Sequence, residues 1–400
     1  MIECSVITSE WCRRLDEADE LSFLRSRFDL PSGLAYLDGN SLGPRPKSVK
    51  PRLEELLDQW GSSVIAGWFD HDWVDLPKTV GARLEPILGA APGTVIACDS
   101  TTVNLYKSAE AACLIRSGGL LTDSGNFPTD LYVLAEVARR NDRDLRVVPP
   151  EELFLAIEPG TAAVAVTQVD FGTGRLHDLA AITTRIHEIG GLSVVDLSHS
   201  AGVMRIDLEA TGVDLAVGCG YKYLNGGPGA PGYIYVSPAL EGNITNPITG
   251  WFGHEDPFQF SPTYRAAAGT ARMQVGTPQV LSMVAFDEAL RLFASVDLDL
   301  VRAKSVGLTS VFIDLADQVV GTAAEVVTPR TAADRGSHVT LRHPDASNVV
   351  RALASRGVIV DYRPPDLIRI GFSPLFNTYS DAWEAAAALA KVVRGVRPRP

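Results

Sequence analysis

Lys222 and Asp196 are the two residues whose types and positions most directly suggest chemistry. Lys222 lies in the glycine-rich stretch Gly-Cys-Gly-Tyr-Lys-Tyr-Leu-Asn-Gly-Gly-Pro-Gly, and Asp196 closes the apolar run 192–196. A buried aspartate is costly without a partner, and a protonated pyridine ring would be a suitable one. A lysine amine and an acid beside the ring nitrogen are what pyridoxal phosphate requires of a protein. On local grounds alone, a solvated lysine and a turn or N-cap aspartate stay open as alternatives.

A second group of residues could hold the phosphate and the ring of such a cofactor. Ser100, Thr101 and Thr102 stand at the start of a helical pattern, where hydroxyls either cap the helix or bind a phosphate. Phe127 precedes a proline and could stack on a ring or anchor a loop. Asp130, three residues later, has the position of an N-cap residue on local grounds.

Arg369 interrupts the apolar run Leu-Ile-Arg-Ile-Gly-Phe-Ser. An arginine inside a buried strand is costly unless it is paired. Asp361 or Asp366 could be its partner within the chain. A substrate carboxylate, bound bidentately by the guanidinium group, is the other reading, and the pattern does not decide between them.

Short apolar runs alternate with helical patterns between residues 90 and 236, which predicts an α/β fold with a mostly parallel central sheet covered by helices. In such sheets ligands bind beyond the carboxyl ends of the strands, where Asp196, His199 and Lys222 stand. The expected helices include 130–141 and 178–189. The expected strands are 94–98, 119–122, 145–148, 162–167, 192–196, 214–218 and 233–236.

The chain from about residue 290 onward has a different pattern, with helices expected at 298–316 and 381–393 and strands at 338–341, 357–360 and 367–371. This alternation predicts a smaller α+β domain. We therefore expect an N-terminal segment, 1–40, that joins the small domain, a large cofactor-binding domain, 41–290, and a small C-terminal domain, 291–400.

Composition excludes several function classes. The net charge of −12 makes nucleic acid and anionic membrane surfaces poor partners. The seven histidines show no metal-binding spacing, so no metal is expected. Five cysteines, an odd number without a Cys-X-X-Cys pair, favour a reducing compartment and hence the cytoplasm.

Several sequence blocks, in one order and spread over nearly the whole chain, resemble the kynureninase family. The two most specific are Gly-Tyr-Lys-Tyr-Leu-Asn-Gly-Gly-Pro-Gly (220–229) and the Gly-Asn-Ser-Leu-Gly portion of 36–44. The resemblance implies the fold of fold-type I pyridoxal-phosphate enzymes, the aspartate aminotransferase-like superfamily. The other blocks are 99–105, 126–130, 195–202, 250–254 and 362–377.

The resemblance also implies a role for each matching residue. Lys222 would hold the cofactor as a Schiff base and later move protons, Asp196 would pair with the ring nitrogen, and Tyr221 would relay a proton. The cofactor-binding residues that it implies are Thr101, Thr102, Phe127, Asp130, Asp196, His199, Tyr221, Lys222, Trp251 and Thr277. The implied substrate-binding residues are Arg369 for the carboxylate, Trp68 near the aromatic ring, and Gly276.

The implied assembly is a homodimer with shared active sites, in which Trp251 and Thr277 reach the pocket of the partner subunit. The implied reaction is hydrolytic cleavage of the Cβ–Cγ bond of kynurenine or 3-hydroxykynurenine, which yields anthranilate or 3-hydroxyanthranilate plus alanine. The segments 66–73, 266–271 and 276–279 depart from the family pattern, so a further substituted ring stays open. Tryptophan breakdown through the kynurenine pathway, NAD precursor supply and secondary metabolism are all compatible pathways.

Two other readings compete with this one. The first is a different fold-type I reaction, such as that of a cysteine desulfurase, a lyase or an aminotransferase. A desulfurase needs a mobile cysteine facing its substrate, and Cys219 is the only cysteine near Lys222. The second is a cofactor-binding homologue without catalysis, which the joint presence of Lys222, Asp196, Tyr221 and Arg369 disfavours.

Overall fold

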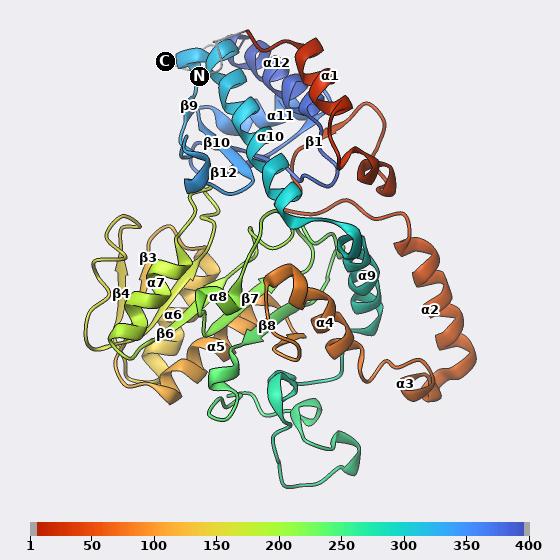
Figure 1. Ribbon diagram of the computed structural model, residues 1–400, viewed down its shortest axis with the longest axis vertical. Helices are drawn as coiled ribbons and strands as arrows, with labels where there is room; N and C mark the ends of the chain where they lie inside the picture. The colour runs from red at the N-terminus through yellow and green to blue at the C-terminus, as the bar shows by residue number, and fades with distance from the viewer. Residues whose placement is uncertain (1–5, 396–400) are drawn as a thin grey trace.

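Two sheets organise the molecule. The computed structural model describes residues 6–395, and the ends of the predicted terminal segments, 1–5 and 396–400, lie outside the described residues. A seven-stranded sheet, here called the central sheet, runs through the larger part of the molecule, and a four-stranded sheet, here called the C-terminal sheet, lies at the upper end of Figure 1.

The central sheet has the order β2-β8-β7-β6-β5-β3-β4. The pairs from β7 to β4 are parallel, whereas β8 runs antiparallel to both β7 and β2. The chain between β7 and β8 is a loop without a crossover helix, so β8 returns beside β7 in the opposite direction. The predicted, mostly parallel sheet is confirmed. Its strands are β2 (Val95–Ala97), β3 (Gly119–Asp123), β4 (Leu145–Val148), β5 (Thr161–Thr167), β6 (Leu192–Asp196), β7 (Leu215–Cys219) and β8 (Gly232–Val236).

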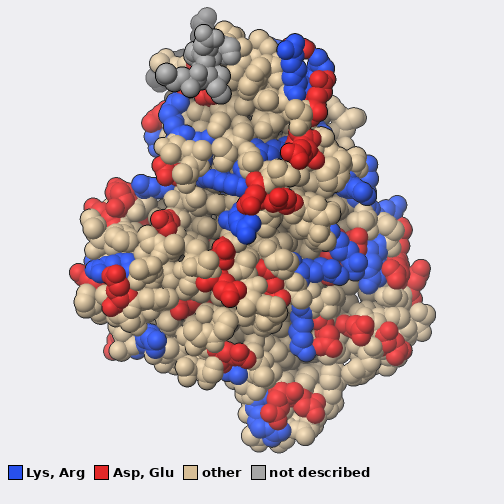
Figure 2. Space-filling model, in the orientation of Figure 1, with Lys and Arg blue, Asp and Glu red and all other residues tan. Residues whose placement is uncertain are grey.

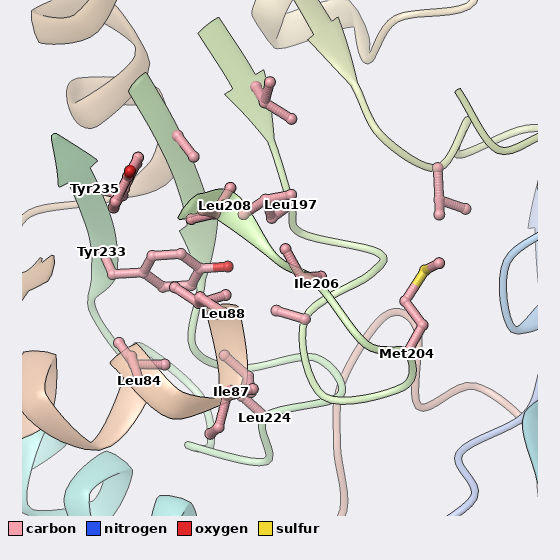
Figure 3. Packing of buried hydrophobic residues seen from close by; sticks show 14 of the residues in the cluster. Leu84, Ile87, Leu88, Leu197, Met204, Ile206, Leu208, Leu224, Tyr233 and Tyr235 are labelled. Carbon is pink, nitrogen blue, oxygen red and sulfur yellow. The ribbon is translucent and has the colours of Figure 1, made fainter. Parts of the chain in front are cut away.

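Helices cover both faces of the central sheet, because its buried strands carry apolar side chains on both sides. Successive residues of β6 show this, since Val194 belongs to the apolar cluster on one face and Val195 to the cluster on the other. Figure 3 shows leucine and isoleucine side chains of α4 beside Tyr233 of β8. The helices of this part are α4 (Leu76–Leu88), α5 (Thr101–Ile115), α6 (Pro128–Arg140), α7 (Leu179–Glu188), α8 (Leu208–Thr211) and α9 (Val280–Leu290).

The C-terminal sheet has the order β12-β13-β10-β9, and all its pairs are antiparallel. Its apolar cluster also contains Cys12, Ala35 and Leu37 from the N-terminal part of the chain. Three helices pack around it: α10 (Leu298–Val319), α11 (Ala346–Ala354) and α12 (Tyr379–Gly395). The strands are β9 (Glu325–Val326), β10 (His338–Arg342), β12 (Asp361–Arg363) and β13 (Leu367–Gly371).

The N-terminal part of the chain contacts both apolar cores. Its strand β1 pairs in parallel with β11 near the C-terminal sheet, whereas Leu21, Leu24 and Phe28 belong to the core of the central sheet. None of the helices in the described range 6–395 is both long and apolar enough to cross a membrane. The remaining elements are α1 (Ser9–Glu17), α2 (Val49–Ser63), α3 (Gly67–Asp70), β1 (Ala35–Tyr36) and β11 (Val358–Ile359).

Candidate active site

A polar cavity of about 270 Å³ lies where the carboxyl ends of the parallel strands meet the C-terminal sheet. Figure 2 shows acidic and basic side chains close together at this level of the molecule. A larger, apolar hollow of about 730 Å³ lies beside α2 and the loop 225–228, but it gathers few groups that could do chemistry. The polar cavity is lined by Ser41, Thr101, Thr102, Phe127, Thr129, Asp130, Thr167, Asp196, Ser198, His199, Tyr221, Lys222, Arg363 and Arg369.

Lys222 lies just beyond β7, and its amine faces the ring of His199, with 3.3 Å between Lys222 Nζ and His199 Nε2. Burial lowers the pKa of His199 well below its usual range, and the nearby charges of Lys222 and Arg369 lower it further. A neutral imidazole therefore stands beside the amine and can accept its proton in a hydrogen bond. Phe127 lies on another side of the amine, 5.9 Å from Nζ to the ring centroid.

Asp196 and Asp130 form a buried acidic pair close to Lys222. Asp196 closes β6 and accepts a hydrogen bond from the backbone N–H of Ser198, with N to Oδ1 at 2.6 Å. Asp130 lies in the first turn of α6. Burial raises the pKa of Asp130 well above its ordinary value, and the charge of Asp196 raises it further. Asp130 therefore holds its proton more readily than an ordinary aspartate, and Asp196, at the end of β6, is placed to face a cation.

The start of α5 provides a site for a phosphate. The Ser100 side chain caps this 15-residue helix by accepting from the Val103 N–H at 3.4 Å, so Thr101 and Thr102 present the first N–H groups and their hydroxyls. Asp99, in a left-handed conformation, is held by the fully buried amine of Lys107 at 2.8 Å. Amine, acid, aromatic ring and helix N-terminus together match the donor set that pyridoxal phosphate requires.

Arg369 reaches the cavity from β13, and its partner within the chain is Asp361. Its Nε donates to Asp361 Oδ1 at 3.0 Å, and its Nη2 donates to Oδ2. Burial alone would raise the pKa of Asp361, but the charge and hydrogen bonds of Arg369 outweigh it and hold the pKa below its ordinary value. Asp366, the other possible partner, lies near Arg342 instead, with 3.4 Å between Arg342 Nε and Asp366 Oδ2.

Four predicted site residues do not line the cavity. Trp68 packs against Trp73, with ring centroids 6.0 Å apart. Trp251 packs against Phe252 at 4.4 Å and is 40% exposed. Gly276 and Thr277 are exposed in the loop before α9. Within one chain the cavity therefore holds the residue predicted for the carboxylate and all of the residues predicted for the cofactor except Trp251 and Thr277, but not the residues predicted for the rest of the substrate, Trp68 and Gly276.

Comparisons with known proteins match this chain along almost its whole length. The kynureninase of Pseudomonas fluorescens is 41% identical over 393 residues, which cover 96% of this chain and 94% of that protein. The kynureninase of Deinococcus radiodurans is 44% identical over 389 residues, covering 95% of each chain. The chain belongs to the kynureninase family. A family model, the kynureninase C-terminal domain, also matches residues 301–389 of this kynureninase-family protein.

Solved structures of other proteins share the fold of this kynureninase-family protein. A variant of the cystine C-S lyase C-DES, with glycine covalently linked to its PLP cofactor, superposes with a TM-score of 0.81 at 18% identity and covers 92% of this chain and 98% of that one. The cysteine desulfurase CsdA from Escherichia coli gives a TM-score of 0.79 at 19% identity, with 94% and 98% covered. At this identity the likeness establishes the fold, the predicted fold-type I architecture.

Five residues that line the cavity of this kynureninase-family chain were not singled out by the sequence. Thr167 ends β5, and the rule that ligands bind at strand ends could have found it. Ser198 lies two residues after Asp196, which ends β6, and could have been found in the same way. The others depend on the folded arrangement, because they arrive from a helix start or from outside the central sheet. These are Ser41, Thr129 and Arg363.

Proposed function

We propose that this protein is a kynureninase, a pyridoxal-phosphate-dependent hydrolase that cleaves the Cβ–Cγ bond of kynurenine, 3-hydroxykynurenine or a further substituted kynurenine. The products are anthranilate, or its 3-hydroxy form, and alanine. The observation that carries the proposal is the joint presence of Lys222, Asp196 and Arg369 in one cavity of a chain 41% identical to a kynureninase.

The part of the cavity lined by Thr101, Phe127 and Asp196 would hold the cofactor. When bound, pyridoxal phosphate supplies an electron sink for charge that develops on the amino acid. The first turn of α5, with Thr101 and Thr102, would bind its phosphate, and Phe127 would lie against its ring. Asp196 would pair with the protonated ring nitrogen, and Asp130, whose pKa burial raises well above its ordinary value, would keep its own proton beside it.

The remaining groups would move protons and orient the substrate. Lys222 Nζ would remove the α-proton, with neutral His199 next to it as hydrogen-bond acceptor. Burial raises the pKa of Tyr221 above its ordinary value, and the neighbouring Cys219 raises it further, so the phenol keeps its proton. Tyr221 can therefore donate that proton to the β-carbon as the carbon–carbon bond breaks, after water has added to the γ-carbonyl.

We also propose that two copies of this chain form a homodimer with shared active sites. Ile65 and Phe260 are 75% and 76% exposed, and apolar side chains at this exposure are typical of interaction surfaces. The aromatic rings of Phe69 and Phe258, 5.0 Å apart, join α3 to the segment 251–260. Figure 1 shows this segment projecting from the end of the molecule opposite the C-terminal sheet. If a second copy bound to this surface, Trp251 and Thr277 of each subunit would lie at the cavity of the other subunit.

The proposal also includes a domain division, a cellular location and the pathways that the reaction would serve. The domain division 1–40, 41–290 and 291–400 is supported by the separate apolar cores of the two sheets. A cytoplasmic location is supported by four buried, free cysteines, which suit a reducing compartment. Catabolism of tryptophan and supply of NAD precursors are the pathways that the reaction would serve.

A side-by-side assay tests the activity. Purified protein loaded with pyridoxal phosphate is given kynurenine, 3-hydroxykynurenine and cysteine in turn, and fluorescent anthranilate products and sulfide are measured. We expect anthranilate release and no sulfide, because Cys219 is buried at the end of β7 and does not line the cavity. Sulfide release without any anthranilate would contradict the proposal and favour a desulfurase.

A further inference from the structure

Lys107 is a fully buried lysine in the second turn of α5, the helix whose start is proposed to bind the cofactor's phosphate. Its Nζ donates to Asp99 Oδ2 at 2.8 Å and to the Met273 carbonyl at 2.6 Å, and it lies 3.5 Å from Cys98 Sγ. An ammonium group has three N–H bonds, so each of them has an acceptor. A buried cation is costly without a counter-charge, and within residues 6–395 Asp99 is the carboxylate that supplies it.

Asp99 lies in the turn between β2 and α5. Its φ of +50° is in the left-handed region, and its carbonyl accepts from the Gly232 N–H of β8 at 2.8 Å. A Cβ at position 232 would lie 2.9 Å from the Thr101 nitrogen, so β8 and this turn are in close backbone contact. Ser100 then caps α5, and Thr101 begins it. The turn is therefore held from two sides, by β8 through its backbone and by Lys107 through the Asp99 carboxylate.

The Asp99 carboxylate stands close to the place where a phosphate would bind. Two Cα–Cα steps of about 3.8 Å each keep the Asp99 Cα within about 7.6 Å of the Thr101 Cα. The Asp99 side chain is 20% exposed, and in the described part of the chain Lys107 is the cation that forms an ion pair with it. An unpaired carboxylate at this distance would repel a phosphate dianion, and its partly buried position would limit screening by salt. The amine of Lys107 removes this repulsion by neutralising Asp99.

We propose that Lys107 is a positioning residue for the cofactor's phosphate, because it neutralises Asp99 and holds the turn that presents Thr101 and Thr102. This inference rests on the proposed binding of the phosphate at these two threonines, and it does not depend on which amino acid the enzyme cleaves. Lys107 does not line the cavity, so it acts through Asp99 and does not touch the cofactor. Its loss should therefore affect only ligands that carry the phosphate.

The test compares two ligands that differ in the phosphate group. Pyridoxal phosphate and pyridoxal are titrated at pH 8 into the full-length protein freed of its cofactor, and binding is followed by absorbance. Lys107→Met removes the charge and keeps most of the side chain's volume. It should weaken the binding of pyridoxal phosphate about 10- to 100-fold and that of pyridoxal less than about threefold. Combining it with Asp99→Asn should restore most of the lost affinity, because no carboxylate is then left unpaired.

Lys304→Met is the matched control, because Lys304 is a second buried lysine, paired with Asp19 at 2.7 Å, and lies on α10 outside the cavity. It should lower the free energy of unfolding without changing the ratio of the two affinities. Equal weakening of both ligands in Lys107→Met, or no recovery in the double variant, would overturn the inference. If Lys107→Met does not fold, Lys107→Gln, which keeps a hydrogen-bond donor, gives the same comparison.

Thr101→Ala separates this inference from the proposed phosphate site. It removes one hydroxyl donor and should weaken pyridoxal phosphate about threefold to tenfold without affecting pyridoxal. If Thr101→Ala shows this selective loss and Lys107→Met does not, the inference alone is overturned. If neither variant shows it, the phosphate does not bind at the start of α5, and that part of the proposed function fails together with the inference.

Discussion

The cavity around Lys222 and the segment from Trp251 to Thr277 differ in how completely one chain builds them. In the cavity, Asp196 and His199 are buried and engaged in hydrogen bonds or close polar contacts. In the segment, Trp251 packs against neighbouring aromatic rings and is 40% exposed, and Phe260 is largely exposed. The cavity brings many polar groups into contact with one another, although Arg363 Nε meets no acceptor within residues 6–395, whereas the segment leaves apolar side chains exposed.

In the homodimer proposed above, this difference would assign different tasks to the two subunits. Groups that must hold a charged cofactor need fixed partners, and the strand ends and the α5 N-terminus supply them inside one chain. Aromatic residues that would enclose the substrate's ring lie where a second copy can approach. In that dimer one chain would supply most of the contacts to the cofactor, and the other would supply Trp251 and Thr277.

The largest expected effect comes from the cavity itself. Lys222→Ala should lower kcat by at least about 10³-fold, because it removes both the covalent anchor of the cofactor and the base at the α-carbon. The measurement is anthranilate release at saturating kynurenine. Lys78→Ala, which removes an exposed lysine paired with Asp75 on α4, is the control and should keep full activity. Substantial turnover by Lys222→Ala would place the chemistry elsewhere.

The division between subunits is tested by mixing inactive proteins. Lys222→Ala and Trp251→Ala subunits, unfolded and refolded together in equal amounts, should regain about a quarter of the normal activity. Half of the dimers would then be hybrids, and each hybrid would carry one intact site. Lys222→Ala mixed with Asp196→Asn is the control, since both changes fall in the same chain's cavity and no hybrid site is intact. Equal recovery in both mixtures, or none in either, would refute a shared site.

The sequence predicted the site residues that depend on local features and missed those that depend on distant parts of the chain. Strand ends are local features, so the run 192–196 and the lysine after β7 were both found, and Ser100–Thr102 were recognised as a helix start. Arg363 was missed because its place at the cavity depends on how β12 pairs with β13 and on Ser41, which arrives from a distant part of the chain. Of Asp361 and Asp366, only the fold shows that Asp361 is the one that contacts Arg369, and the substrate carboxylate stays a prediction.

Tyr221 gives a smaller effect within the cavity. Tyr221→Phe should slow turnover about 10- to 100-fold, because the phenol is the proposed proton donor to the β-carbon, and should leave the cofactor absorbance unchanged. Tyr233→Phe is the control, since the Tyr233 hydroxyl is buried without a hydrogen-bond partner in the described part of the chain. Unchanged turnover in Tyr221→Phe would remove this residue from the chemistry.

The smallest effect concerns stability and again separates the two regions. His338 lies behind His199, with ring centroids 5.9 Å apart, and burial lowers its pKa from 6.5 to about 3, with the charge of Arg369 acting in the same direction. A histidine whose pKa is depressed by folding stabilises the protein above its unfolded pKa, and that contribution falls as the pH drops below about 6.5. At pH 5 the loss from this one residue should be about 2 kcal/mol.

Urea unfolding of the protein at pH 8 and pH 5 measures this loss directly. His338→Gln removes the titrating ring, so the variant should lose about 2 kcal/mol less than the unaltered protein between the two pH values. His71→Gln, a change at the partly exposed C-cap residue that follows α3 near the aromatic segment, should follow the unaltered protein. An identical pH dependence in all three proteins would mean that the buried His338 does not make the free energy of unfolding depend on pH. The groups around the cavity would then tolerate a buried charge better than their burial implies.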